Sequence, residues 1–149
     1  MTIKEELYKQ CQFFVNKRLQ TIQDIITSNQ RALQSETKSS AGDKHETGRA
    51  MLQLEMEKAG QQLSGITLMK ETLAKLAISK NSKVASLSSV VITDNANYFL
   101  SISAGQLIVA NTRYFAISVS SPVGKLLLGK QENETIVFNG KTITVKEVF

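Results

Sequence analysis

The feature that most constrains this chain is a pair of apolar seams with coiled-coil spacing within residues 1–80. From Lys4 to Leu33 there is no Gly or Pro, and apolar residues recur every three or four positions, which predicts an amphipathic helix. The first seam comprises Val15, Leu19, Ile22, Ile26, Asn29 and Leu33. The second seam comprises Leu52, Met56, Ala59, Leu63, Ile66, Lys70, Leu73 and Ala77. Because steps of four and three alternate in both, the two helices are expected to pair.

The two seams also predict the direction of pairing. In an antiparallel pair, facing positions have numbers with a constant sum, and here that sum is 85. Leu33 then faces Leu52, and the same register accommodates six layers. The midpoint falls between Gly42 and Asp43, inside a run of small and polar residues at 38–43 that favours a turn. The sequence therefore predicts a helical hairpin that reverses beside Asp43.

This hairpin is expected to occupy residues 1–80, with its tip near 39–48. At 1.5 Å per residue, each arm projects on the order of 50 Å, which is longer than a compact core requires. Such a hairpin can serve as a scaffold or as an arm that reaches into a partner. The polar stretch from Lys80 to Lys83 then separates it from a second domain over residues 84–149.

Two carboxylates stand at the predicted tip, Asp43 and Glu46. Their spacing is that of a capping box, in which the first residue caps the helix and the second reaches back to it. The same spacing places both side chains on one helix face, where they can offer oxygen ligands to a hard cation such as Mg²⁺. Two carboxylates are too few to hold Mg²⁺ alone, so a metal role requires a partner that supplies the other ligands. The nearby cations Lys38, Lys44 and Arg49 suit phosphate or RNA contacts, although a solvated surface explains them as well.

Charge and composition limit the kinds of function and cellular location that fit this chain. The formal charge of +5 is spread over both halves without a basic block, which favours a mildly basic surface over a dedicated nucleic-acid stripe. The single cysteine, Cys11, cannot form an internal disulfide, and with one histidine it cannot build a Cys/His metal site, so we expect a small core residue. The acidic start of the chain and the lack of a long apolar stretch predict a cytoplasmic protein without membrane contact, and we expect a monomer.

Residues 84–149 change to an extended pattern. Six segments are rich in β-branched and aromatic residues and are predicted strands, at 89–93, 98–103, 106–110, 114–119, 134–138 and 142–148. Asn139-Gly140 between two apolar segments predicts a two-residue hairpin turn. Ser121, Pro122 and Gly129 mark the cap, first position and end of one short helix, whose leucines are expected to cover the sheet. We therefore expect an α+β protein, a long N-terminal antiparallel coiled coil followed by a small β-rich domain with one short helix.

Two motifs resemble those of the bacterial Gre transcript cleavage factors, the GreA/GreB-like transcription elongation factors. The first is Gly42-Asp43-Lys44-His45-Glu46, and the second runs from Ser121-Pro122 to Leu127-Leu128-Gly129-Lys130. The resemblance implies an FKBP-like C-terminal domain that binds RNA polymerase through unassigned residues within 84–149. It also implies a coiled coil that enters the polymerase secondary channel and reaches the backtracked RNA 3′ end, with DNA near the active centre as a further contact.

In this resemblance Asp43 and Glu46 help the polymerase to hold its second Mg²⁺ and to orient a water molecule that hydrolyses the RNA. The chain would be an accessory factor rather than an enzyme, and it would bind no cofactor alone. Its sequence departs from the family at Thr47-Gly48-Arg49-Ala50, where Gre factors typically have Asn-Ala-Glu-Tyr. This departure leaves open a regulator that occupies the channel without stimulating cleavage. Two further hypotheses are a scaffold without polymerase contact and an FKBP-like prolyl isomerase or chaperone.

Overall fold

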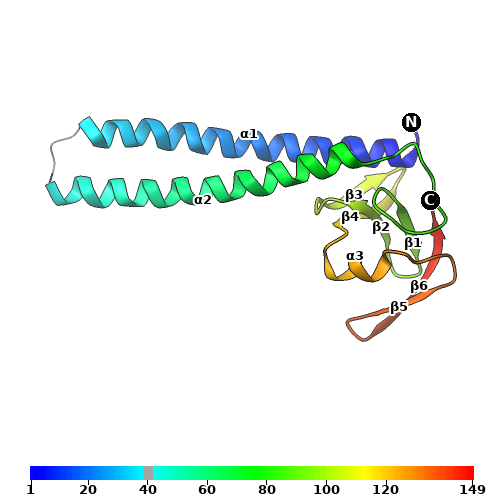
Figure 1. Cartoon of the computed structure of the whole chain (residues 1–149). Helices are drawn as coiled ribbons and strands as arrows, with labels where there is room; N and C mark the ends of the chain where they lie inside the picture. The colour runs from blue at the N-terminus through cyan, green and yellow to red at the C-terminus, as the bar shows by residue number, and fades with distance from the viewer. Residues whose placement is uncertain (39–41) are drawn as a thin grey trace. The chain divides into compact units, whose positions relative to one another are not determined.

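The computed structural model describes the backbone of residues 1–38 and 42–149, and the side chains of residues 1–35 and 46–149. Two long helices, α1 (Ile3–Lys38) and α2 (Gly42–Lys75), precede a six-stranded mixed sheet and a short helix, α3 (Pro122–Leu127), as Figure 1 shows. The α+β class predicted from the sequence is confirmed. Within the described residues, no helix is long and apolar enough to cross a membrane.

The chain divides into two compact units. One is the hairpin unit, Val15–Met69, and the other, the sheet unit, combines Met1–Phe14 with Lys70–Phe149. The sheet unit is therefore discontinuous in sequence and includes the first turns of α1 and the last turns of α2. The heptad pattern, in contrast, assigns all of residues 1–80 to one coiled-coil domain and 84–149 to the other.

Helix α1 starts at a complete capping box. The backbone N–H of Glu5 donates to Oγ1 of Thr2 at 3.1 Å, and the N–H of Thr2 donates to Oε2 of Glu5 at 3.2 Å. Thr2 is the residue immediately before the helix, which begins at Ile3. Both interactions satisfy amides that the first helical turn leaves without a backbone acceptor.

The predicted seam of α1 is confirmed within the hairpin unit. Its six members, Val15 to Leu33, are all buried or half-buried, and Asn29 is buried among them. On α2, Leu52 through Ile66 follow the prediction in the same way, and Leu73 is buried. The specific cross-helix pairs of the register with the sum of 85 stay a prediction.

The C-terminal end of the α2 seam was predicted wrongly. Lys70 is exposed and Met69 is half-buried in its place, while Ala77 is exposed and lies beyond Lys75, where α2 ends. The buried stripe therefore runs through Ile66, Met69 and Leu73. Burying an ammonium group without a partner is costly, so the apolar Met69 takes the inward position and Lys70 stays in solvent.

The sheet has the strand order β3-β4-β2-β1-β6-β5. The strands are β1 (Val90–Thr93), β2 (Asn97–Ser101), β3 (Gly105–Val109), β4 (Thr112–Ser118), β5 (Thr135–Phe138) and β6 (Lys141–Val148). All six correspond to predicted strands. β2 and β4 are parallel, and the other neighbouring pairs are antiparallel. The turn between β5 and β6 is Asn139-Gly140, whose φ values are 51° and 76°. A type I′ hairpin turn requires positive φ at both central residues.

Side chains on both faces of the sheet are buried. Phe99 and Leu100 are adjacent in β2 and point to opposite faces, yet both are fully buried. Leu100 belongs to a cluster with Leu127 of α3. Of the α3 leucines expected to cover the sheet, only Leu127 does so, because Leu126 and Leu128 remain 38% exposed. A six-residue helix presents one narrow face, which admits one of three consecutive leucines.

The first turns of α1 contact the sheet within the sheet unit. Cys11 is fully buried, as predicted, and its Sγ lies 3.9 Å from Oγ of Ser101 in β2. Nε2 of Gln10 donates a 2.9 Å hydrogen bond to the carbonyl oxygen of Ile108 in β3. These contacts explain why residues 1–14 form one unit with the sheet.

Candidate functional site at the hairpin tip

The candidate site lies in the first turns of α2, beyond the end of α1 at Lys38. Helix α2 begins at Gly42, so Asp43 is its second residue and Glu46 its fifth. Residues three apart on a helix are neighbours, with Cβ atoms about 5–6 Å apart. Asp43 and Glu46 therefore share one face of α2, as the sequence predicted.

The position of the helix start bears on the capping interpretation. At α1 the cap, Thr2, directly precedes the first helical residue. A box with Asp43 as its cap would by the same spacing place the first helical residue at Lys44, whereas α2 runs from Gly42. A difference of two residues lies within the fraying of a helix end, so the capping box stays a prediction. Glu46 lies in the first turns of α2, where the positive end of the helix dipole favours a carboxylate.

Glu46 is exposed to solvent, and so is Thr47, whereas Gly48 and Arg49 are half-buried. An exposed carboxylate keeps its oxygens available for a ligand from outside the chain. The side chains of Lys38, Asp43 and Lys44 lie outside the described residues, so their predicted roles stay predictions.

A metal ion at the tip would need more ligands than the two predicted carboxylates. Among the side chains that the structure describes, no three His, Cys, Asp or Glu residues gather as a metal site. Mg²⁺ prefers six oxygen ligands in an octahedral arrangement. Asp43 and Glu46 are too few to fill this sphere, so the remaining ligands have to come from a partner or from water.

The second motif has a structural role in the sheet unit. Oγ of Ser121 accepts a 3.1 Å hydrogen bond from the N–H of Gly124 and donates a 2.6 Å bond to the carbonyl oxygen of Ser118. A side chain at Gly124 would overlap that same carbonyl oxygen. Ser121 is the predicted cap of α3, with Pro122 at the first helical position. These residues therefore fix the turn that leads from β4 into α3.

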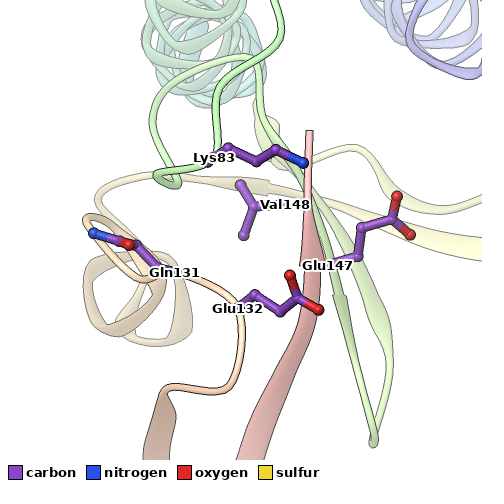
Figure 2. A pocket seen from close by; sticks show the side chains of 5 residues that line it. All are labelled: Lys83, Gln131, Glu132, Glu147 and Val148. Carbon is purple, nitrogen blue, oxygen red and sulfur yellow. The ribbon is translucent and has the colours of Figure 1, made fainter.

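A pocket of about 160 Å³ opens on the sheet unit, and Figure 2 shows the five side chains that line it. They come from the segment before β1, the segment after α3 and the end of β6, and they are Lys83, Gln131, Glu132, Glu147 and Val148. An aromatic ring is absent from this lining, and its charged groups are of both signs. The pocket therefore does not have the aromatic lining expected of a prolyl isomerase site.

Sequence reasoning missed two residues with clear structural roles. Lys4 is only 4% exposed, and its Nζ donates a 2.7 Å hydrogen bond to the carbonyl oxygen of Lys80. Thr2 caps α1 together with Glu5. The Thr-x-x-Glu pattern would have revealed the cap, whereas a lysine in the first turn of an amphipathic helix gives no signal of burial.

No protein-family model matches the chain. No curated protein matches it either. Among solved structures, one described as that of the transcription factor Gfh1 matches with a TM-score of 0.36 and 18% sequence identity, over 94% of this chain and 92% of that chain. At this identity the roles of individual residues cannot be carried from one chain to the other.

Proposed function

We propose that this chain is a Gre-like transcription factor that binds bacterial RNA polymerase in the cytoplasm and stimulates the cleavage of backtracked RNA. The sheet unit would dock on the polymerase through residues within 84–149. The hairpin would enter the secondary channel with Asp43 and Glu46 at its tip. The motifs Gly-Asp-x-x-Glu and Ser-Pro, in this order and separation, support the proposal.

The placement of Asp43 and Glu46 is the observation that carries this proposal. Both residues lie in the first turns of α2, and Glu46 is exposed. The hairpin that ends there is built from helices of 36 and 34 residues, on the order of 50 Å long. A carboxylate pair of this kind suits a catalytic centre to which another molecule contributes most of the ligands.

Mg²⁺ shared with the polymerase would activate a water molecule and neutralise charge on the scissile phosphate. The chain itself would contribute two carboxylates on one helix face. One oxygen of Asp43 or Glu46 would complete the ligand sphere, and another would accept a hydrogen bond from the attacking water. The chain would thereby stimulate a reaction whose remaining machinery belongs to the polymerase.

A defined backtracked elongation complex tests this proposal directly. We expect the wild-type chain to accelerate removal of the RNA 3′ segment, and Asp43→Asn and Glu46→Gln each to reduce the acceleration about 10-fold to 100-fold. Binding of both variants to the polymerase should be unchanged, since the sheet unit is intact. Thr47→Ser is the matched tip control and should retain activity. Wild-type protein that binds but does not accelerate cleavage would refute this function.

A channel-occupying regulator without cleavage activity is the second candidate. It is favoured by the residues after Glu46, where Gly48 lowers helix propensity by about 1 kcal/mol relative to Ala and Arg49 replaces an acidic family residue with a cation. This candidate predicts that the wild type and Asp43→Asn change pausing or initiation equally, with no RNA cleavage by either. Cleavage that disappears in Asp43→Asn excludes it.

The isomerase and scaffold hypotheses predict different results in an isomerisation assay and in a polymerase co-purification. An isomerase would accelerate cis/trans isomerisation of a prolyl peptide, and the pocket lining offers no aromatic support for such an activity. A scaffold would fail to retain polymerase in a co-purification experiment. Retention of the polymerase without isomerase activity is the outcome that our proposal requires.

A further inference from the structure

The hairpin unit contains a polar defect in its apolar seam. Asn29 is 7% exposed and lies between the aliphatic seam residues Ile26 and Leu33. Its Nδ2 is the one buried side-chain nitrogen or oxygen without a hydrogen-bond partner among the residues that the structure describes. A buried donor without an acceptor lowers stability by about 1–3 kcal/mol. This layer is therefore weaker than its aliphatic neighbours.

Helix α2 carries two glycines in its second half, Gly60 and Gly65. A Cβ atom added at Gly60 or at Gly65 would meet no atom within 4 Å. Packing therefore does not require glycine at either position. Each glycine lowers helix stability by about 1 kcal/mol relative to alanine, because it leaves the backbone more freedom in the unfolded state.

Hydroxyl groups weaken the same stretch of backbone. Oγ of Ser64 donates to the carbonyl oxygen of Gly60 at 3.2 Å, and Oγ1 of Thr67 donates to the carbonyl oxygen of Leu63 at 3.0 Å. Such bonds share acceptors with the helical amides and favour bending. The seam of this stretch comprises Ala59, Leu63 and Ile66, and Ala59, at 2% exposed, contributes much less apolar area than the other two.

In the predicted register Asn29 faces Met56, about one helical turn before Gly60 and about two and a half turns before Gly65. We propose that residues 59–67 of α2, opposite 18–26 of α1 and next to the Asn29 layer, form a flexure at which the hairpin opens locally while both ends stay helical. The flexure lets the tip half of the hairpin change direction relative to the rest of the hairpin. It concerns the hairpin alone and does not require the proposed function.

Amide hydrogen exchange of the full chain, read by peptide, tests the flexure. In the wild type we expect residues 59–67 to exchange at least about tenfold faster than 50–57 and 69–74, since local opening exposes those amides. The double variant Gly60→Ala/Gly65→Ala should slow exchange at 59–67 by about tenfold or more. Equal protection of 59–67 and both flanking segments in the wild type would overturn the proposal.

Gly48→Ala is the matched control, because it makes the same substitution in the same helix outside the flexure. It should leave exchange at 59–67 unchanged, and an effect as large as that of the double variant would mean general stiffening of α2 and would overturn the proposal. Asn29→Leu should slow exchange at 25–33 and 59–67 together. Slowing confined to 25–33 would overturn the coupling of the polar layer to α2. These substitutions favour helix or apolar packing, so we expect every variant to fold.

Discussion

Lys4 and Lys80 are joined by a 2.7 Å hydrogen bond from the buried ammonium of Lys4 to the carbonyl oxygen of Lys80, which lies five residues beyond α2. Nζ of Lys4 also lies 3.5 Å from Oδ1 of Asn81. The start of α1 is thereby tied to the segment that leads into the sheet. Replacing Lys4 by Met preserves the aliphatic stem and removes the ammonium that donates both hydrogen bonds.

We expect Lys4→Met to lower the free energy of unfolding by about 1–3 kcal/mol at neutral pH, because two part-buried hydrogen bonds from a charged group are lost. Burial lowers the pKa of Lys4 below its usual 10.5. A lysine with a lower pKa in the folded state penalises folding at pH values below that pKa, and the penalty disappears as the pH rises past 10.5. The deficit of Lys4→Met should therefore grow as the pH approaches 10.5. Urea unfolding across this range measures it, and the exposed Lys9→Met is the control.

The thiol of Cys11 should be nearly inert in the folded chain. Burial raises its pKa to about 11, partly offset by the contact with Ser101. At pH 8 the lower thiolate population alone should slow reaction with a thiol reagent by about 100-fold relative to an unperturbed cysteine. Labelling in the presence and absence of urea measures the ratio. A folded protein that reacts as fast as the unfolded chain would contradict the packing of α1 on β2.

Leu127 and Leu126 should differ sharply when truncated. Leu127 is fully buried, and Leu127→Ala should lower the free energy of unfolding by about 2–5 kcal/mol because it removes core contacts and leaves a cavity. Leu126 is 38% exposed, so Leu126→Ala should cost less than about half as much. Thermal unfolding of the two variants measures the difference, and similar losses would show that α3 packs by another face.

Gly124 should not tolerate a methyl group. A Cβ at this position would overlap the carbonyl oxygen of Ser118 and lie 2.8 Å from Oγ of Ser121. Gly124→Ala should therefore lower the free energy of unfolding by about 1–3 kcal/mol or more, through displacement of the turn before α3. Gly60→Ala, which meets open space in a helix interior, should raise it by about 1 kcal/mol. Chemical denaturation of both variants tests the contrast, and a stable Gly124→Ala would refute it.

Local patterns predicted most elements of this fold. The Asn139-Gly140 turn and the Ser121-Pro122 helix start depend on residues adjacent in sequence, and the structure has both. The packing of Cys11 on Ser101 joins residues 90 positions apart, so no local pattern reveals it. The apolar periodicity of a helix is also the same whether the helix packs on another helix or on a sheet. The division into two units therefore could not be read from the heptads.

The start of α2 was predictable from the sequence, whereas the role of its first residues was not. The midpoint of the two seams put a turn beside Asp43, and α2 does begin next to that residue. The capping interpretation follows from the preference for Asp at helix caps and stays a prediction. A docking surface for a partner would give no signal of this kind, since exposed residues follow no periodicity.

The discontinuity of the sheet unit has a consequence for synthesis. Phe149 exchanges two backbone hydrogen bonds with Val90, so the pairing of the sheet's central strands includes the last residues described. The 90 residues that separate Cys11 from Ser101 take on the order of 10 s to translate. Within that interval, residues 15–69 are synthesised as one complete unit. Cys11, in contrast, leaves the ribosome long before the strand that carries Ser101, and its packing has to wait for that strand.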